Sequence, residues 1–344
     1  MPNEILTRAI DEICAGTHLT ADHTSAALAE IMEGRASEVQ TAAFLISLRA
    51  KGETVSELVG LARTMRSLAA HVEIDKPDLL DTAGTGGGPT TFNISTTAAL
   101  IAAGAGCSVA KHGNRSATSR SGSADVLEAL GVDIELSPAE VATCIDDVGF
   151  GFMFAPKHHK AMAHVVPVRK ELGVRTIFNF LGPLTNPAGA GAHLLGVSDR
   201  SYQEIIADAL LQLGCRHALV VSADDGIDEL SIASRTRVIE VADGGTEEWF
   251  VEAAELGLQT APLDAIPGGE PADNAAVIRS VLDGEPGPAR DVSILNGGAA
   301  IYVAGGSADL AEGVGKATEA IDSGAVASVL DRLVARSREL SGAS

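Results

Sequence analysis

Apolar residues recur at helical spacing throughout the first 70 residues of the chain. This pattern predicts four helices, over residues 5–16, 21–34, 37–52 and 55–72. The first three segments each end in a glycine, which favours helix termination. Thr20 and Thr54 are placed to cap the N-termini of the second and fourth helices. Because no strand pattern interrupts them, these segments predict a small helical lobe.

The pattern changes near Pro77, where short apolar segments alternate with polar loops and further helices. Strands are predicted at residues 78–81, 107–111, 132–136, 217–222 and 236–241. Helices are predicted at residues 96–104, 124–130 and 307–340, while residues 293–302 fit either a strand or a helix. Strand–loop–helix–strand units of this kind are typical of a mostly parallel sheet with helices on both faces. We therefore predict an α/β fold, with a small all-helical domain at residues 1–72 and a large α/β domain at 73–344.

Composition agrees with this fold class and predicts a soluble cytoplasmic protein. Hydrophobic residues make up 46% of the chain and aromatic residues only 3%, so the apolar content is the Ala, Val, Leu and Ile of an α/β core. No apolar run reaches the roughly 18–20 residues of a membrane span, and the N-terminus does not resemble a signal peptide. The four cysteines lie far apart without a C-x-x-C pair, as expected of thiols in a reducing compartment.

The formal charge of −21 changes which ligands are expected. A general nucleic-acid binder needs a basic surface, so this charge argues against nucleic acid as a partner. The same charge repels small anionic substrates. Any phosphate site must therefore be locally basic or use a cation.

The segment DTAGTGGGPTTFNIST, residues 81–96, combines a glycine-rich loop with small hydroxyl and amide side chains. Glycines after a strand let backbone N–H groups turn toward one point, and the start of the next helix attracts an anion. Asn93, Ser95 and Thr96 add neutral groups that could bind phosphate oxygens or a metal-bound water. The spacing matches neither G-x-G-x-x-G nor a P-loop, so a turn, a helix cap or another kind of nucleotide loop remain alternatives.

The segment KHGNRSATSRSGSAD, residues 111–125, is a local basic loop in this acidic chain. It begins where a predicted strand ends and finishes where a predicted helix begins. Loops at the carboxyl ends of neighbouring parallel strands form the ligand sites of open α/β sheets. A solvated basic loop is the alternative, but beside the glycine loop a polyphosphate site is favoured.

An acidic segment, DDGIDE at residues 224–229, follows the predicted strand 217–222. Carboxylates at the same edge of the sheet oppose an anion unless a hard cation lies between them. Mg²⁺ takes a few carboxylates and bridges substrate phosphates, so Asp228 and Glu229 are candidate ligands, with Asp224 and Asp225 closer to the strand. An acidic turn on an acidic protein is the alternative.

The segment from residue 155 to 187 carries further candidate binding groups. Arg169 and Lys170, on a predicted helix, could bind a carboxylate, although a plain surface helix is the alternative. The adjacent His158 and His159 have no third ligand at metal spacing. The apolar stretch with two prolines that follows is more typical of packing or a hinge.

Four motifs in this order, GTGG with TFNIST, KHGNRSATSRSGSADVLEALG, VRKELGVRTIFNFLGPLTNP and DGIDEL, resemble the anthranilate phosphoribosyltransferases of tryptophan biosynthesis. The resemblance implies a homodimer formed through the helical domain, to which residues of about 165–190 return. It also implies Mg²⁺-dependent transfer of a phosphoribosyl group from phosphoribosyl pyrophosphate (PRPP) to the amine of anthranilate. No side-chain nucleophile is required, and the sequence shows none.

Matching positions carry over the family's site residues. The resemblance places in contact with PRPP the residues Gly84, Gly87, Gly88, Thr91, Asn93, Ile94, Ser95, Thr96, Lys111, His112, Gly113, Asn114, Arg115, Ser116, Ala117, Thr118, Ser119 and Ser123. It places at anthranilate the residues Gly84, Asn114 and Arg169, with His112, His159 and Pro183 along its entry route. It assigns Mg²⁺ to Ser95, Asp228 and Glu229, and the catalytic roles to Lys111, Asn114 and Arg169.

One position departs from the family pattern. The family loop reads G-T-G-G-D-G and is one residue longer, whereas this chain has Gly88-Pro89 in place of Asp-Gly. We therefore expect an altered Mg²⁺ dependence or substrate affinity, with the reaction retained. Two alternatives to the transferase are a pyrimidine-nucleoside phosphorylase of the same two-domain layout and a non-catalytic relative that binds nucleic acid.

Overall fold

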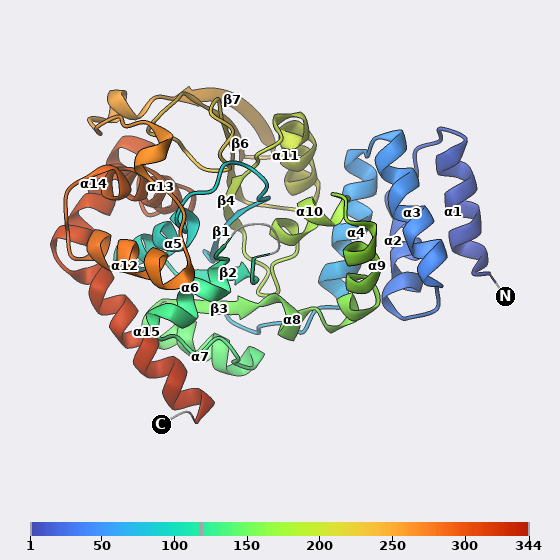
Figure 1. The fold of residues 1–344 in the computed structure, drawn as a ribbon, viewed down its shortest axis with the longest axis horizontal. Helices are drawn as coiled ribbons and strands as arrows, with labels where there is room; N and C mark the ends of the chain where they lie inside the picture. The colour runs from blue at the N-terminus through green and yellow to red at the C-terminus, as the bar shows by residue number, and fades with distance from the viewer. Residues whose placement is uncertain (1, 117–119, 343–344) are drawn as a thin grey trace.

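The computed structural model of the chain describes residues 2–116 and 120–342 (Figure 1). A bundle of N-terminal helices lies at one end of the molecule, and a sheet with its covering helices forms the rest. The bundle helices are α1 (Glu4–Cys14), α2 (Ala21–Met32), α3 (Glu38–Lys51) and α4 (Val55–Ser67). Both predicted caps are present: the Thr20 hydroxyl accepts from the His23 amide, and Thr54 and Glu57 form a capping box.

A later segment packs against this bundle. It contains the short helices α8 (Ala155–His158), η1 (Lys160–His164), α9 (Val166–Leu172), α10 (Phe178–Leu181) and η2 (Gly182–Leu184). Val165, Ile177 and Leu181 are buried in the same apolar cluster as the side chains of α1–α4. We therefore propose the division expected from the sequence, a helical lobe of residues 1–72 completed by residues of about 165–190.

The α/β lobe is built on one seven-stranded sheet in the order β3-β2-β1-β4-β5-β6-β7. Its strands are β1 (Leu80–Gly84), β2 (Val109–Gly113), β3 (Phe150–Phe154), β4 (Ala192–Gly196), β5 (His217–Ala223), β6 (Thr236–Ala242) and β7 (Gly245–Val251). The first five pair in parallel, and β6 and β7 add an antiparallel edge. The predicted mostly parallel α/β fold is confirmed.

Helices cover both faces of this sheet (Figure 1). The longer helices of this lobe are α5 (Ile94–Gly104), α6 (Ser123–Leu130), α7 (Pro138–Val148), α11 (Gln203–Gln212), α12 (Pro271–Leu282), α13 (Pro288–Val303), α14 (Leu310–Asp322) and α15 (Ala325–Ser341). Three short ones are η3 (Arg200–Tyr202), η4 (Ala253–Leu256) and η5 (Leu263–Ala265). Along β5, Leu219 and Val221 face the core beneath α5 and α13, whereas Ala218 and Val220 face α11 and the helical lobe.

One predicted strand is wrong. Residues 132–136 lie between α6 and α7 without pairing to the sheet. Val132, Ile134 and Leu136 are buried, so their alternation imitates a strand. The backbone amide of Asp133 donates instead to the Ser337 hydroxyl of α15. The segment is an extended connection that fills the core.

Other elements differ from the sequence expectation in detail. The ambiguous segment 293–302 is helical and lies within α13. The predicted helix 307–340 is two helices, α14 and α15, separated at Gly324 with φ +74°. Three strands were not predicted: β3, β4 and β7. Across the described residues, no helix has the length and apolar character needed to cross a membrane.

The sheet brings the three candidate loops to one edge. The glycine loop follows β1, the basic loop follows β2 and the acidic loop follows β5. Since β1 pairs in parallel with β2 and β4, and β4 with β5, the carboxyl ends of these strands point the same way. The expected placement of the glycine and basic loops on neighbouring strands is therefore observed.

Candidate active site

The glycine loop, residues 84–88, is held open by contacts from three other segments. Gly86 and Gly87 have φ of +67° and +88°, values that favour glycine. The Gly86 amide donates to Asp228 Oδ2 at 2.7 Å. Its carbonyl accepts from Ser198 Oγ at 2.6 Å and from Arg175 Nη2 at 3.1 Å. The backbone of this loop is thus fixed by polar groups around the point where an anion would bind.

Helix α5 begins directly after this loop and presents small polar side chains. Asn93 links three segments, because its amide donates to the Ser121 carbonyl and its side-chain oxygen accepts from Ser121 and Asn274. Thr96 Oγ1 is buried and finds no hydrogen-bond partner among the described residues. Ile94 is buried in the apolar core, so only its backbone is placed to meet a ligand. Thr91 forms an isolated bridge with Pro267.

Lys111 is buried against β1, next to the start of the glycine loop, and is not on the surface. Its side chain is 1% exposed, and Nζ donates to the carbonyl and hydroxyl oxygens of Thr82 in β1. Burial lowers the pKa of this ammonium group, and the nearby Asp81 and Glu229 carboxylates oppose that effect. Lys111 therefore places a positive charge behind the loop, next to the candidate metal ligands.

The rest of the basic loop closes on an acid of α6. Asp125 accepts from the backbone amides of Ser116 and Gly122 and pairs with Arg115. Arg115 also pairs with Glu128, so its guanidinium is directed toward α6. Asn114 is exposed at the loop, while Gly113 and Ser123 contact each other closely at its base. The predicted contacts Ala117, Thr118 and Ser119 lie outside the described residues.

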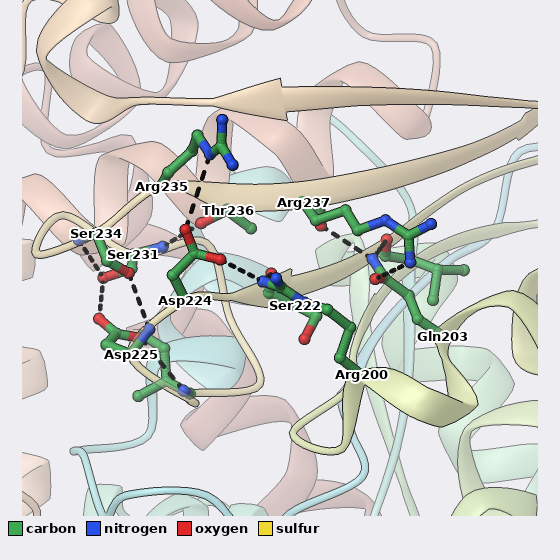
Figure 2. Close-up of polar contacts among 12 residues, drawn as sticks. Arg200, Gln203, Ser222, Asp224, Asp225, Ser231, Ser234, Arg235, Thr236 and Arg237 are labelled. Carbon is green, nitrogen blue, oxygen red and sulfur yellow. Dashed lines mark hydrogen bonds and ion pairs between the residues drawn. The ribbon is translucent and has the colours of Figure 1, made fainter.

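The acidic loop divides its four carboxylates between two tasks. Figure 2 shows Asp224 between Arg200 and Arg235, and Asp225 accepting from the Ser231 hydroxyl. Asp224 joins the loop to Arg200, and Asp225 bonds within the same connection between β5 and β6. Asp228 and Glu229 lie on the site side, half-buried, with Asp228 bonded to the glycine loop.

The pKa values of both inner carboxyls are raised. Burial raises the pKa of Asp228, against the effects of the Gly86 amide and of Arg175. Burial and the neighbouring Asp228 raise the pKa of Glu229 well above its usual value, against Lys111 and the Ser95 amide. A bound cation would offset the cost of holding these two charges together.

The donor set suits Mg²⁺ shared with a substrate. The described residues contain no cluster of three or more His, Cys, Asp or Glu side chains that would hold a metal alone. Asp228, Glu229 and the Ser95 hydroxyl are hard oxygen donors, and the Ser95 backbone lies at Glu229. Mg²⁺ is commonly held by one or two carboxylates, with phosphates and water completing its shell.

Two paired glycines shape the place of Asp228. Gly84 and Gly196 are register partners at the ends of β1 and β4. A Cβ on Gly84 would lie 2.2 Å from Asp228 Oδ2, and one on Gly196 would lie 1.6 Å from the Asp228 carbonyl oxygen. Asp228 reaches the glycine loop only because neither position carries a side chain.

Arg169 lies half-buried on α9, and among the described residues it has no carboxylate partner. Its guanidinium carbon is 5.4 Å from the Phe178 ring centroid. Burial lowers the pKa of the Arg169 guanidinium, and a bound carboxylate would stabilise its positive charge. This environment is that expected of a group that binds a carboxylate from outside the chain.

The residues predicted to line the anthranilate entry route, His112, His159 and Pro183, lie close together in the structure. The His112 and His159 ring centroids are 5.0 Å apart, and His112 Nδ1 is 3.3 Å from the carbonyl oxygen of Gly182. Pro183, the next residue, is buried in η2. His112 Nε2 is buried and lacks a hydrogen-bond partner within the described part of the chain.

We expect this histidine pair to make folding acid-sensitive. Burial lowers the pKa of His112 to about 4 and that of His159 to about 3, so the folded state binds fewer protons than the unfolded state. The contribution of the neutral histidines to the free energy of unfolding is therefore complete above about pH 6.5. It falls as the pH drops toward 4, by about 3 kcal/mol for one such group. Urea unfolding at pH 7.5 and 4.5 measures this loss, which should be smaller in His112→Asn. An equal loss in His112→Asn and in a control, exposed His23→Asn, would contradict the assignment.

The structure gives a reason for the glycine at position 88. A Cβ there would lie 2.4 Å from the Gly226 carbonyl oxygen, because the short loop is packed against the acidic loop. Pro89 approaches the same turn: a Cβ on Gly226 would lie 3.7 Å from its Cδ. The departure from the family loop therefore comes with direct contact between the glycine and acidic loops.

Gly88→Asp is accordingly expected to raise the Mg²⁺ concentration needed for half-maximal activity. The added side chain pushes on Gly226, two residues before Asp228. Gly88→Ala separates the causes, because it brings the same steric contact without the carboxylate. A Mg²⁺ titration of turnover in which both variants match the unchanged chain would rule out this coupling of the two loops.

Several residues of the site were not predicted as such. Asn186, in the stretch expected to be packing, donates to Asp81 Oδ2 at 2.7 Å and to the Ala110 carbonyl at 2.8 Å. Asp81 in turn accepts from the His112 amide, so this pair fixes the start of the basic loop. Gly196 ends β4 and Ser198 follows two residues later; β4 is buried at every position, so no alternation marks it in the sequence. The sequence signal that could have identified Asn186 as a site residue is its polar side chain within an apolar stretch.

Comparison with known proteins agrees with this architecture. Residues 7–69 match the model of the glycosyl transferase family helical bundle domain, and residues 76–327 match that of the glycosyl transferase family a/b domain. The chain is 52% identical over 323 residues to the anthranilate phosphoribosyltransferase of Symbiobacterium thermophilum, covering 94% of this chain and 95% of that one. It is 51% identical to that of Thioalkalivibrio sulfidiphilus, covering 96% and 98%.

The chain belongs to the anthranilate phosphoribosyltransferase family.

Solved structures of the anthranilate phosphoribosyltransferase family share the whole fold. The enzyme from Thermus thermophilus superposes with a TM-score of 0.91 at 46% identity, covering 96% of this chain and 99% of that one. The Saccharomyces cerevisiae enzyme in complex with PRPP and Mg gives 0.89 at 27% identity, covering 97% and 98%. The resemblance inferred from the four motifs is confirmed, and neither the phosphorylase nor the nucleic-acid-binding alternative is favoured.

Proposed function

We propose that this chain transfers the 5-phosphoribosyl group of PRPP to the amine of anthranilate, releasing pyrophosphate, with Mg²⁺ as cofactor. One observation carries the proposal: the glycine loop, the buried Lys111 and the carboxylates Asp228 and Glu229 converge at one edge of the sheet. The Saccharomyces cerevisiae relative has been solved with PRPP and Mg, and separately with 4-fluoroanthranilate. Both ligands suit the groups described above.

The pyrophosphate end of PRPP suits the glycine loop and the start of α5. The absence of side chains at Gly84 and Gly87 lets Asp228 and Arg175 approach the loop. The side chains of Ser95 and Thr96 lie at the positive end of the helix. Lys111 adds a buried positive charge behind them. When bound, Mg²⁺ at Ser95, Asp228 and Glu229 supplies charge stabilisation for the leaving pyrophosphate. We propose that the other predicted PRPP contacts complete this site from the basic loop.

Catalysis then rests on positioning and electrostatics. The bond between ribose C1 and the pyrophosphate oxygen breaks as the anthranilate nitrogen bonds to C1, through a transition state with positive charge on the ribose. The electron pair of the broken bond leaves with pyrophosphate, and the nitrogen then releases one proton to water. Arg169, free of carboxylate partners among the described residues, orients anthranilate through its carboxylate, and we propose Asn114 and the Gly84 backbone as its other contacts. His112, His159 and Pro183 line the route to it. No covalent enzyme intermediate is needed.

We also propose a cytoplasmic homodimer formed through the helical lobe. Large apolar side chains are exposed there, Val39 by 79%, Ile5 by 44% and Ile46 by 37%. They lie on α1 and α3, which pack together. Light scattering should give twice the mass of one chain, and Val39→Lys should shift the mass toward the monomer. A monomeric unchanged chain would contradict this assembly.

The acceptor is tested by comparing substrates. Pyrophosphate release should require anthranilate together with PRPP and Mg²⁺, and uridine or thymidine with inorganic phosphate should give no free base. Phosphorolysis of either nucleoside without pyrophosphate release from PRPP would replace the transferase by the phosphorylase alternative.

A further inference from the structure

Arg175 is a basic side chain of the helical-lobe segment that reaches the glycine loop. It lies between α9 and α10, and its guanidinium donates through Nη2 to the Gly86 carbonyl at 3.1 Å. A Cβ on Gly87 would lie 2.4 Å from Nη1, so that nitrogen stands directly over the next residue of the loop. In the site described above, Arg175 only holds the glycine loop, and neither that description nor the sequence motifs assign it a contact with a ligand.

The position of Arg175 is fixed from the helical lobe. Arg49 of α3 donates to the Arg175 carbonyl at 2.9 Å. The guanidinium carbon of Arg175 lies 5.5 Å from the ring centroid of Phe180, a buried residue of α10. The backbone and the Phe180 contact thus belong to the helical lobe, and from there the guanidinium reaches the glycine loop of the other lobe. Any movement of the helical lobe relative to the sheet moves this charge relative to the glycine loop.

Among the described residues, Arg175 has one side-chain hydrogen bond and no carboxylate paired with it. Its Nη2 bonds to a neutral carbonyl, and for Nη1 the described residues supply no hydrogen-bond acceptor. The loop from Gly84 to Thr91 contains no carboxylate that could pair with it. Asp228 is close enough for the guanidinium to favour its ionised form, yet Asp228 is bonded to the Gly86 amide.

We propose that Arg175 is a pyrophosphate-contacting residue, which brings a positive charge from the helical lobe to the glycine loop. This inference rests on the proposed function, because it names a further residue of the same site. As the bond between ribose C1 and the pyrophosphate oxygen breaks, the electron pair stays on the pyrophosphate. The Arg175 N–H groups then leave the Gly86 carbonyl and donate to two pyrophosphate oxygens, for which the planar guanidinium is suited.

Binding of inorganic pyrophosphate in Mg²⁺ buffer to the purified full chain tests this directly. Arg175→Gln should raise the dissociation constant for pyrophosphate about 10–100-fold, the usual effect of losing a charge-assisted hydrogen bond. Arg175→Lys should recover part of the lost affinity. The KM for PRPP should rise in Arg175→Gln while the KM for anthranilate stays within about twofold. The exposed Arg63→Gln on α4 is the matched control and should bind as the unchanged chain does.

Two outcomes would overturn the inference. If Arg175→Gln binds pyrophosphate as tightly as the unchanged chain or more tightly, Arg175 only holds the empty loop. If Arg175→Gln does not fold, as judged by circular dichroism, the same comparison is made with the uncharged variant Arg175→Met, and unchanged affinity there again rejects the contact. Failure of the proposed function looks different: the unchanged chain then binds pyrophosphate without turning over anthranilate.

Discussion

Replacing the inner carboxylates together, Asp228→Asn with Glu229→Gln, is expected to lower kcat/KM for PRPP by about a thousandfold or more. These two groups are the acids directed at the site, and burial raises the pKa values of both carboxyls, an effect that a bound cation would offset. The double variant removes the negative charge that would hold Mg²⁺ beside the leaving pyrophosphate. The effect is measured by initial rates at varied PRPP and Mg²⁺.

Asp224→Asn is the matched control for that experiment. Asp224 belongs to the same loop but pairs with Arg200 and Arg235 at its outer side (Figure 2). Its loss should cost less than about tenfold, as expected of an exposed ion pair. Equal losses in the control and the double variant would mean that the loop's structure, and not a metal site, explains both.

Gly196→Ala is expected to lower kcat by about a hundredfold although Gly196 touches no substrate in the proposed site. The added methyl group would overlap the Asp228 carbonyl, which lies 1.6 Å from the Cβ position, so the acidic loop must shift. A displacement of about 1 Å in a positioning group commonly costs this much. The half-saturating Mg²⁺ concentration should rise in parallel, because Asp228 moves away from the glycine loop.

A glycine elsewhere in the fold separates this effect from general instability. Gly315 lies in α14, and a Cβ there would meet no atom within 4 Å. Gly315→Ala should therefore keep full activity and the same Mg²⁺ response. A folded Gly196→Ala variant with normal kcat and normal Mg²⁺ response would show that the contact between β4 and Asp228 has no part in the site.

The sequence predicted best where local chemistry decides the structure. Thr20 and Thr54 begin helices because their side chains satisfy free backbone amides, and this can be seen within four residues. Strand β3, FGFMF, is buried at every position and shows no alternation, so no period marks it. Residues 132–136 show the opposite case, in which buried alternate side chains occur without strand pairing. Whether a segment pairs as a strand depends on residues far away in the sequence, so a local pattern cannot predict it.

The same distinction holds for the site. The motifs identified Lys111, which lies in β2, and Asp228 and Glu229, which follow β5, because these segments reach the same edge of the sheet. They did not show that Lys111 is buried beneath Thr82, or that Arg175 crosses from the helical lobe. Gly88 was recognised only as a departure from the family. Its contact with the Gly226 carbonyl is a tertiary one, and it is the geometry that accounts for the missing side chain.

The loss of anthranilate fluorescence on adding PRPP and Mg²⁺ tests the account most directly, with the product identified by its mass. The unchanged chain should consume anthranilate with one pyrophosphate released per molecule. Arg169→Ala should raise the KM for anthranilate about 10–100-fold and leave the KM for PRPP nearly unchanged. No loss of anthranilate, or equal KM values for anthranilate in the two proteins, would contradict the proposed reaction or the place of its acceptor.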